Sequence, residues 1–536
     1  MEAAGVAQRR VGVGRLSRRR LRARRGGWMP VALLAVSALV ALVALAPIGF
    51  LIDETLSAGW GEIHRLLFRP FVGHLLENTG ELVAVGTLGC TTIGVGVAWL
   101  VERTDLPWRR FWGVVAALPI TVPAFVTSYS WVSITPAVQG FGGATGIVIL
   151  AYYPLVYLPV AAVLRGTDPA LEETARSLGL GPWRTFFRVT LPQTRVALCG
   201  GALLVAIHLL SEFGAFEMLR FQTFTTAIYD EYKLTFDGAS ASMLASVLVL
   251  LCLGLLIAEV GVRGRGRYAR VDSGAARAIT PVRLGRARWP LTGAMAALVG
   301  LGIGLPLATV VYWLATGNSA GEIEVGTLVT DTWSTLRLGL GAAALTTLAA
   351  LPISLLAVRH PGWWTTLVER AAYLPFALPG ITVALALIVL SLQHVPAIYD
   401  STALLMVAYA ILALPLALVA VRAALAQAPP VHEEVARSLG VRPSMALLRV
   451  TIPRILPGLG AAAALVFLAT VTELTATLLL APIGTETLAT GFWLKATAFR
   501  YGAAAPYAAL MVAISAAPTY LLTKRLGGAI DPGRAR

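Results

Sequence analysis

Long apolar runs, separated by short polar segments, are the main pattern along this chain. Several of the runs approach 20 residues with almost no charge, which is long enough for a helix to cross a bilayer. Apolar residues are continuous within these runs rather than alternating, and this favours helices over the strands of a barrel. Because backbone groups in lipid are satisfied only in helices or closed barrels, the pattern predicts an all-α polytopic membrane protein.

About twelve spans are predicted, six in each half of the chain. They lie at roughly 29–52, 80–101, 112–135, 141–164, 196–219, 240–262, 290–315, 335–357, 372–391, 402–424, 456–480 and 506–523. The spans define a first repeat over 29–262 and a second over 290–523, joined by a basic linker at 263–289. Residues 1–28 and 524–536 are the predicted tails.

Composition and charge fit this prediction. The chain is 57% hydrophobic and 13% charged, whereas soluble domains carry about 25% charged residues. If the N-terminus is inside, the predicted inner segments hold 36 of the 43 Lys and Arg residues. This asymmetry follows the positive-inside rule and predicts that both termini are cytoplasmic. The net charge of +15 is then explained by these loops and does not indicate a nucleic-acid partner.

A polar cassette occurs twice in this apolar chain. Residues 172–192 read EETARSLGLGPWRTFFRVTLP and residues 433–453 read EEVARSLGVRPSMALLRVTIP, with 12 identities in 21 positions at a separation of 261. Other matching segments, LPITVP at 118–123 and LPFALP at 374–379, are separated by 256 residues. Since six spans is an even number, the two repeats are predicted to be parallel rather than inverted.

The cassette predicts a compact helix–turn–helix on the cytoplasmic side. Leu171, Ala175 and Leu178 recur at the spacing of one helical face, with Glu172 and Arg176 off that face. Carboxylates early in the helix suit its N-terminus.

The cassette also carries its own stop signals. Gly179 and Gly440 are expected to cap the first helix with a positive φ. Pro192 and Pro453 are expected to break the chain before the next span. An interfacial helix on lipid headgroups is the alternative, but two near-identical copies favour two equal protein partners.

Each cassette resembles the EAA loop of ABC importer permeases, in which Glu is followed by Ala, then Gly, then a hydrophobic–Pro pair. The corresponding residues are Glu172, Glu173, Ala175, Gly179 and Pro192 in the first copy and Glu433, Glu434, Ala436, Gly440 and Pro453 in the second. Glu173 and Glu434 replace the first alanine of the family pattern. The resemblance implies that each loop forms a coupling helix seated in a groove of an ATPase subunit, so that the chain binds two copies of that ATPase.

The resemblance extends over nearly the whole chain and is strongest to the fused permeases of ferric iron importers. It rests on residues 118–131, 211–232 and 473–493. It implies a type I ABC importer permease fold in a bacterial cytoplasmic membrane, with ferric iron delivered by an extracytoplasmic binding protein. Fused thiamine permeases share the length and the double cassette, so thiamine or another small solute stays open.

No enzymatic site is expected on this chain. The sequence has no GxxxxGK[ST] run and therefore no phosphate cradle. ATP and Mg²⁺ are expected on the partner ATPase, and this chain is expected to need no cofactor, to have no catalytic residue and to carry no assigned metal site.

Two carboxylates occupy equivalent places in the two halves. Glu212 and Glu473 lie in or near the fifth span of each repeat, and Glu217 follows a turn and a half further outward. Carboxylates within a membrane commonly face a translocation pathway, and oxygen ligands suit a hard trivalent cation. The alternative is that each glutamate caps a helix or pairs with an arginine. His208, one turn before Glu212, is expected to be packed and hydrogen-bonded.

Two other classes of protein remain as alternatives. One is a secondary transporter driven by an ion gradient, and the other is a membrane scaffold, against which the duplicated cassette argues. By resemblance, the outer segments 220–239 and 481–505 receive the binding protein; otherwise they are solvated loops beside the aromatic belts.

Overall fold

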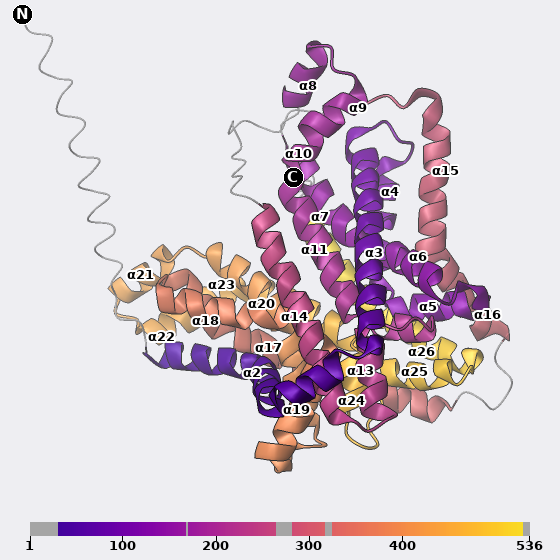
Figure 1. Ribbon diagram of the computed structural model, residues 1–536. Helices are drawn as coiled ribbons and strands as arrows, with labels where there is room; N and C mark the ends of the chain where they lie inside the picture. The colour runs from indigo at the N-terminus through magenta and orange to yellow at the C-terminus, as the bar shows by residue number, and fades with distance from the viewer. Residues whose placement is uncertain (1–30, 168–169, 264–280, 317–323, 529–536) are drawn as a thin grey trace, which may run out of the picture. The chain divides into compact units, whose positions relative to one another are not determined.

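The computed structural model describes residues 31–167, 170–263, 281–316 and 324–528 (Figure 1). The predicted tail at 1–28 lies outside the described residues. So do most of the linker at 263–289 and the end of the tail at 524–536.

Helices make up almost all of the described residues. The first are α2 (Val31–Leu67), α3 (Pro70–Arg103), α4 (Arg109–Val115), α5 (Ala124–Val132), α6 (Phe141–Tyr152), α7 (Pro154–Gly166), α8 (Ala170–Ser177), α9 (Pro182–Thr185), α10 (Leu191–Gln193), α11 (Arg195–Ser211), α12 (Gly214–Met218), α13 (Phe224–Lys233) and α14 (Gly238–Arg263). The others are α15 (Arg288–Val299), α16 (Leu305–Thr316), α17 (Val325–Arg359), α18 (Trp363–Tyr373), α19 (Gly380–His394), α20 (Thr402–Ala426), α21 (Val431–Ser438), α22 (Pro443–Ala446), α23 (Ile452–Val471), α24 (Thr475–Leu480), α25 (Leu488–Thr497) and α26 (Tyr501–Gly528).

Short 3₁₀ and π-helical turns interrupt these helices. The 3₁₀ turns are η1 (Leu118–Thr121), η2 (Pro136–Val138), η4 (Gly285–Ala287), η6 (Leu374–Ala377) and η7 (Pro396–Ile398), and the π-helical turns are η3 (Phe186–Thr190), η5 (Gly300–Gly304) and η8 (Leu447–Thr451). The described residues contain no strand, only an isolated bridge between Thr104 and Val282.

The helices account for the predicted spans. In the described part of the chain, eight helices are long and apolar enough to cross a membrane, or eleven if each of three bent pairs is one span. The shorter apolar helix Tyr501–Ala516 corresponds to the last predicted span. The all-α polytopic class is therefore confirmed.

Contacts within the chain divide it into two units. Unit 1 comprises Met1–Leu45, Ala343–Pro375 and Ala413–Val466, and unit 2 comprises Ala46–Ala342, Phe376–Leu412 and Phe467–Arg536. The first cassette lies in unit 2 and the second in unit 1. Both units contain segments from the second half of the chain. This division therefore does not test the predicted repeat boundaries, which remain predictions.

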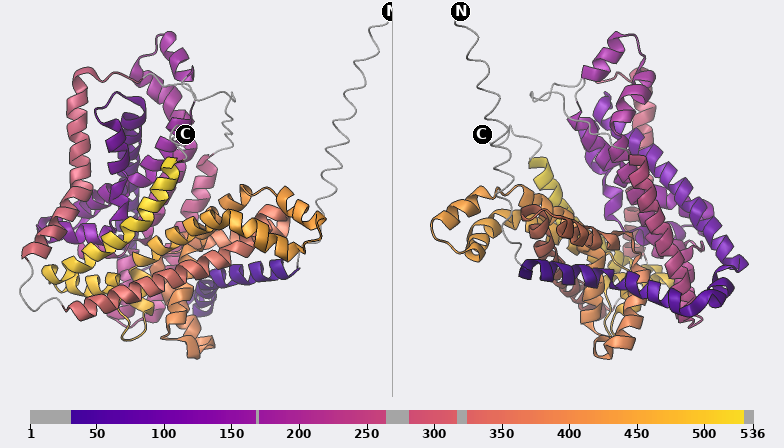
Figure 2. Two further views of the ribbon diagram at one scale, coloured as in Figure 1. Left: turned by 180° about the vertical axis from the view of Figure 1, so that it is seen from behind. Right: turned by 60° about the vertical axis from the view of Figure 1, so that its left-hand side comes forward.

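The core of unit 2 includes a close packing of α3, α7 and α11, in which α3 and α7 lie side by side (Figures 1 and 2). A Cβ atom added to Gly94 of α3 would lie 2.8 Å from Val156 Cβ and 2.9 Å from the Tyr153 carbonyl oxygen. A Cβ atom on Gly201 of α11 would lie 2.9 Å from Val156 Cα. Small residues let helix backbones approach closely in a membrane, so these two glycines set the spacing of the three helices.

Proline breaks two of the spans. In unit 2 the helical segments Arg109–Thr121 and Ala124–Val132 meet at an angle of 88°, with Pro123 between them. The repeated motif in the second half also ends a helix, where η6 is followed by Pro379 and the start of α19. A proline has no N–H to donate to the preceding turn, which explains why LPITVP and LPFALP both mark kinks.

Replacing Gly94 with leucine is expected to force α3 away from α7 and to cost about 1–3 kcal/mol of stability through overpacking. Thermal unfolding of the purified protein in detergent, followed by size-exclusion chromatography, should show a lower midpoint. Gly96→Leu is the matched control, because Gly96 lies on the same helix and has no atom within 4 Å of an added Cβ. Equal losses for the two variants would contradict the packing argument.

Candidate functional site

Both cassettes fold as the predicted helix–turn–helix. In the first, α8 ends before Gly179 and the chain continues into α9, and in the second, α21 ends before Gly440 and continues into α22. Gly179 and Gly440 each have φ +84°, the left-handed conformation that glycine adopts without a steric penalty. Their amides donate to the carbonyls of Arg176 and Arg437 at 2.9 and 3.1 Å, so each glycine closes its helix as expected.

The first glutamate of the cassette points inward. Glu172 is buried, with its Oε1 3.2 Å from Arg103 Nε and its Oε2 3.7 Å from Arg176 Nη2. Thr190 Oγ1 donates to Glu172 Oε1 at 3.0 Å. The ion pair is almost fully enclosed, with the side chains of Arg103 and Glu172 only 1% and 6% exposed.

The enclosed side of α8 does not coincide with the face predicted to carry Leu171, Ala175 and Leu178. Leu171, Ala175 and Leu178 do not share a buried surface: Ala175 is buried, whereas Leu171 and Leu178 are exposed. Arg103, at the end of α3, lies beside the cassette and draws Glu172 inward, and a charge that enters a protein interior requires such a partner. Pairing across the fold therefore overrides the apolar spacing of the isolated helix.

The second cassette repeats the contact. Glu433 Oε1 accepts hydrogen bonds from Arg359 Nη2 at 2.9 Å and from Thr451 Oγ1 at 2.6 Å. Arg359 Nη2 also donates to the Ala428 carbonyl at 3.0 Å. Here the side chains of Arg359 and Glu433 are 14% and 23% exposed, so the pair is less enclosed than the first.

We call each set of three residues a glutamate clasp: Glu172, Arg103 and Thr190, and Glu433, Arg359 and Thr451. Sequence reasoning missed the arginines and threonines. The signal was available, because Arg103 and Arg359 are separated by 256 residues and Thr190 and Thr451 by 261, the two offsets of the repeat. Each clasp ties a cassette to the end of the second span of its half.

The end of the linker lies beside the first clasp. Val282 N donates to the Arg103 carbonyl at 2.8 Å, and Asp105 N donates to the Val282 carbonyl at 3.1 Å. Asp105 Oδ1 in turn accepts from Leu284 N at 2.8 Å. The chain that enters the second half is therefore anchored to the same turn that carries Arg103.

The exposed side of each cassette is apolar at its tip. Leu178 and Leu439, directly before the capping glycines, are 78% and 79% exposed. Val435 is also exposed. Exposed apolar side chains at matching places in a duplicated loop are typical of a protein contact. These residues, rather than the enclosed glutamates, lie at the surface of the cassettes.

The break predicted after each cassette occurs only in the first copy. Helix Trp183–Gln193 is bent by 73° from α11, whereas Pro443–Val471 forms one continuous helix that includes Pro453. The prediction of a break at Pro453 is therefore wrong. The π-helical turn η8 ends two residues before this proline, and η3 ends two residues before Pro192, so this turn is common to both copies and does not distinguish them.

Glu212 and Glu473 each stand where a span gives way to a short helix. Glu212 Oε1 accepts from Ala215 N at 2.9 Å, at the start of α12. Glu473 Oε1 accepts from Ala476 N at 3.1 Å, at the start of α24. Of the alternatives for these glutamates, helix capping is confirmed.

The surroundings of the two carboxylates differ. Tyr152 OH donates to Glu212 Oε2 at 2.5 Å, and His208 packs its ring edge-on against Tyr152 at 5.6 Å. His208 Nδ1 lies 2.9 Å from the Leu204 carbonyl, so this histidine is hydrogen-bonded as expected, although it is exposed rather than packed inside the protein. Glu473 instead has Gly380 beside it, where an added Cβ would lie 2.6 Å from Glu473 Oε1. Only a glycine fits there.

Glu217 lies on α12, beyond the capped break, and its amide donates to the Phe213 carbonyl at 3.0 Å. Within the described ranges, no three His, Cys, Asp or Glu side chains are grouped so as to hold a metal ion.

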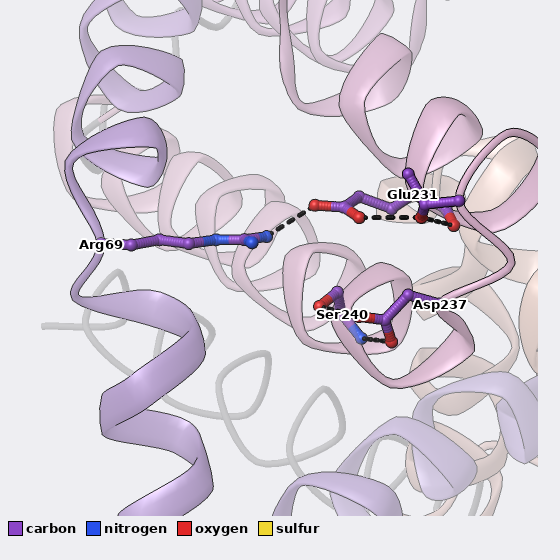
Figure 3. A network of polar contacts seen from close by, with 5 residues as sticks. Arg69, Glu231, Asp237 and Ser240 are labelled. Carbon is purple, nitrogen blue, oxygen red and sulfur yellow. Dashed lines mark hydrogen bonds and ion pairs between the residues drawn. The ribbon is translucent and has the colours of Figure 1, made fainter.

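The outer segment of the first half is held by a polar network (Figure 3). Arg69, in the turn between α2 and α3, reaches Glu231 of α13 at 2.7 Å. Asp237 accepts from Ser240 N at 3.0 Å and from Ser240 Oγ at 2.7 Å, which caps α14. These hydrogen bonds, the backbone one first, hold the pKa of Asp237 below its usual value.

Comparison with known families fits the duplicated architecture. Residues 91–260 and 347–536 both match the family described as binding-protein-dependent transport system inner membrane component. The chain belongs to this family. It is thus a multi-pass inner membrane protein and a transport component rather than an enzyme, with two copies of the family's domain on one polypeptide.

The relatives of this protein match it over very different shares of its chain. The Fe(3+)-transport system permease protein FbpB 2 of Haemophilus influenzae is 37% identical over 91% of this chain and 96% of its own length. The putative ferric transport system permease protein FbpB 1 of the same organism is 23% identical over 79% of this chain and 73% of its own. The molybdenum transport system permease protein ModB of Escherichia coli strain K12 is 30% identical over 25% of this chain and 66% of its own length.

Neutralising Glu172 tests the first clasp. Glu172→Gln leaves Arg103 buried without its charge partner, and breaking such a pair typically costs about 3–5 kcal/mol. We expect amide hydrogen exchange over residues 170–190 to become faster. Glu433→Gln should have a smaller effect, because the second clasp is more exposed.

Glu434→Gln is the matched control, since Glu434 is the exposed neighbour of Glu433 in the same helix. Unchanged exchange in Glu172→Gln would mean that the clasp does not hold the cassette.

Proposed function

We propose that this protein is the permease subunit of an ATP-driven importer and that it carries ferric iron across the membrane. The duplicated cassette, which presents Leu178 and Leu439 outward, is the observation that supports an ATPase partner. The ferric cargo is supported by the relative named as an Fe(3+)-transport permease, which matches 91% of the chain. Two ATPase subunits bind, one at each cassette, and carry the ATP and Mg²⁺.

The two clasps transmit movements of the partner to the spans. A movement imposed on the cassette tip passes through Glu172 to Arg103 on α3, and through Glu433 to Arg359 on α17. Glu433 accepts a charged hydrogen bond from Arg359, and Glu172 forms an enclosed ion pair with Arg103 at 3.2 Å. Because both contacts hold opposite charges close together, the cassette and the span move as one body. Each half then alternates access by rocking when the ATPase subunits close, and an extracytoplasmic binding protein delivers the cargo. In this proposal both termini and both cassettes are cytoplasmic.

The same proposal places Glu212, Glu473 and Glu217 along the pathway. Capping uses one oxygen of Glu212 and of Glu473 and fixes both carboxylates at the breaks of two spans. Breaks of this kind, with polar groups turned inward, are where membrane transporters hold their substrates. Carboxylate oxygens suit a hard cation, so a ferric ion would pass between groups that are already oriented.

Changing both tip leucines tests the coupling and the cargo together. In cells that lack this gene, the wild type should restore entry of labelled ferric iron and leave labelled thiamine entry unchanged. Leu178→Asp with Leu439→Asp should lower iron entry at least about tenfold, because a buried charge without a partner weakens a contact by several kcal/mol. Leu178→Met with Leu439→Met is the control and should keep activity.

The other outcomes separate the alternatives. Restored thiamine entry instead of iron would keep the machinery and change the cargo. Iron entry that survives ATP depletion but collapses with an ionophore would identify a secondary transporter. Full activity of the aspartate variant, present at normal level in the membrane, would refute the coupling role of the cassettes.

Removing the charge of Glu212 and Glu473 without removing the caps tests the pathway. Glutamine has the same shape and can still accept from Ala215 N or Ala476 N. We expect Glu212→Gln with Glu473→Gln to lower iron entry about tenfold or more while ATPase subunits still copurify, since hard cations favour charged oxygen ligands. Tyr152→Phe is the control for the hydrogen bond alone. Uptake within twofold of the wild type in the double variant would show that the carboxylates serve only as caps.

A further inference from the structure

The second helix of the cassette differs between the two copies. In the first half, Trp183–Gln193 lies at 73° to α11 and so runs nearly at right angles to that span. Gln193 Nε2 donates to the Val189 carbonyl at 2.9 Å, and Thr194 Oγ1 donates to the Leu191 carbonyl at 2.8 Å. These side chains satisfy carbonyls at the bend. The second copy has Ile455 at the position of Thr194, and its helix continues straight into α23.

Aromatic side chains cover one side of the bent helix. Trp183 and Phe187 are 66% and 60% exposed, one turn apart, and their rings are 6.4 Å apart and stacked. Trp183 also stacks on Trp99 at 5.7 Å. Trp99 lies one turn before the end of α3, at the depth where tryptophan is enriched in membrane proteins.

Two arginines form a stripe beside the aromatic one. Arg184 and Arg188 are both exposed and are also one turn apart. The second copy has Ser444, Met445, Leu448 and Arg449 at the four corresponding positions. It therefore lacks every aromatic residue of this surface and one of its two positive charges.

We propose that Trp183, Arg184, Phe187 and Arg188 form a binding surface for anionic phospholipid headgroups, present in the first repeat only. A helix that lies across the end of a span, with aromatic residues beside basic ones, is typical of the membrane interface. The arginines can pair with lipid phosphates while the rings rest at the level of the acyl chains. The proposal takes from the proposed function only that α11 spans the bilayer and that the cassette lies at its cytoplasmic end.

The charge pattern favours lipid over the ATPase as the occupant of this surface. A partner present in two identical copies needs matching contacts on both cassettes. The cassette tips supply them with Leu178 and Leu439, whereas the surface formed by Trp183, Arg184, Phe187 and Arg188 has only Arg449 as an equivalent in the second copy. One coupling loop is thus held to the membrane through its second helix and the other is not, which would make the two loops respond differently to the same partner.

Spin labels at equivalent positions test the proposal. Phe187→Cys and Leu448→Cys would each be labelled in the full chain after Cys90, Cys199 and Cys252 are replaced with alanine. The protein would be placed in nanodiscs of phosphatidylcholine with one quarter phosphatidylglycerol, with and without the ATPase subunits. Collision with oxygen and with a water-soluble nickel chelate then reports the depth of each label.

We expect the label at 187 to lie within the interface, about 5–10 Å below the headgroup boundary, whether or not the ATPase is bound. The label at 448 should contact the nickel chelate freely without the ATPase. Arg184→Gln with Arg188→Gln, or nanodiscs of phosphatidylcholine alone, should raise nickel collision at 187 about threefold or more, given the attraction of each arginine to an anionic surface. Arg449→Gln is the matched control and should change nothing.

Two results would overturn the proposal. The label at 187 could be as accessible to nickel as the label at 448 in the phosphatidylglycerol nanodiscs. Alternatively, its shielding could appear only when the ATPase is added, which would make this surface part of a protein interface. If iron uptake proved not to depend on ATP while the label at 187 stayed immersed, the lipid surface would stand and the proposed function would fail.

Discussion

A buried charge that must be neutralised organises the candidate site. Glu172 lies inside the fold with its side chain 6% exposed, and Arg103 lies there with it. Burying either charge without the other would be costly, so the position of the cassette and that of the end of α3 stabilise one another. The same logic applies to Glu433 and Arg359. Each cassette is thus tied to the span that carries its arginine.

This constraint changes what the glutamate of the cassette does. The residue that defines the motif serves the loop's own architecture, and the surface that we propose for a partner consists of the apolar side chains next to the capping glycine. Such a division is physically reasonable, because a buried charged pair fixes geometry while apolar contacts supply affinity. A strong motif can therefore locate a docking element without marking the residues that make the contact.

The structural role of the two carboxylates at the broken spans is compatible with the pathway role that we propose for them. A helix that starts inside a membrane leaves amide groups without partners, and Glu212 and Glu473 each accept from one of them. The capping role explains why a costly charge is placed there at all. It also holds the carboxylates in fixed orientations, which is what a pathway for a hard cation would require. The two roles reinforce one another.

The sequence alone determined the class of the protein, because long apolar runs in lipid have few solutions and helices are the one that fits them. It also located the duplicated cassettes, their capping glycines and the proline kinks, since these depend on local backbone chemistry. The direction in which Glu172 points was decided by the tertiary structure, because Arg103 is 69 residues away along the chain and no helical periodicity includes it. The tertiary structure likewise decided that the helix continues through Pro453 in the second copy and bends at Thr194 in the first. These outcomes depend on which backbone carbonyls accept hydrogen bonds from side chains or turns in three dimensions.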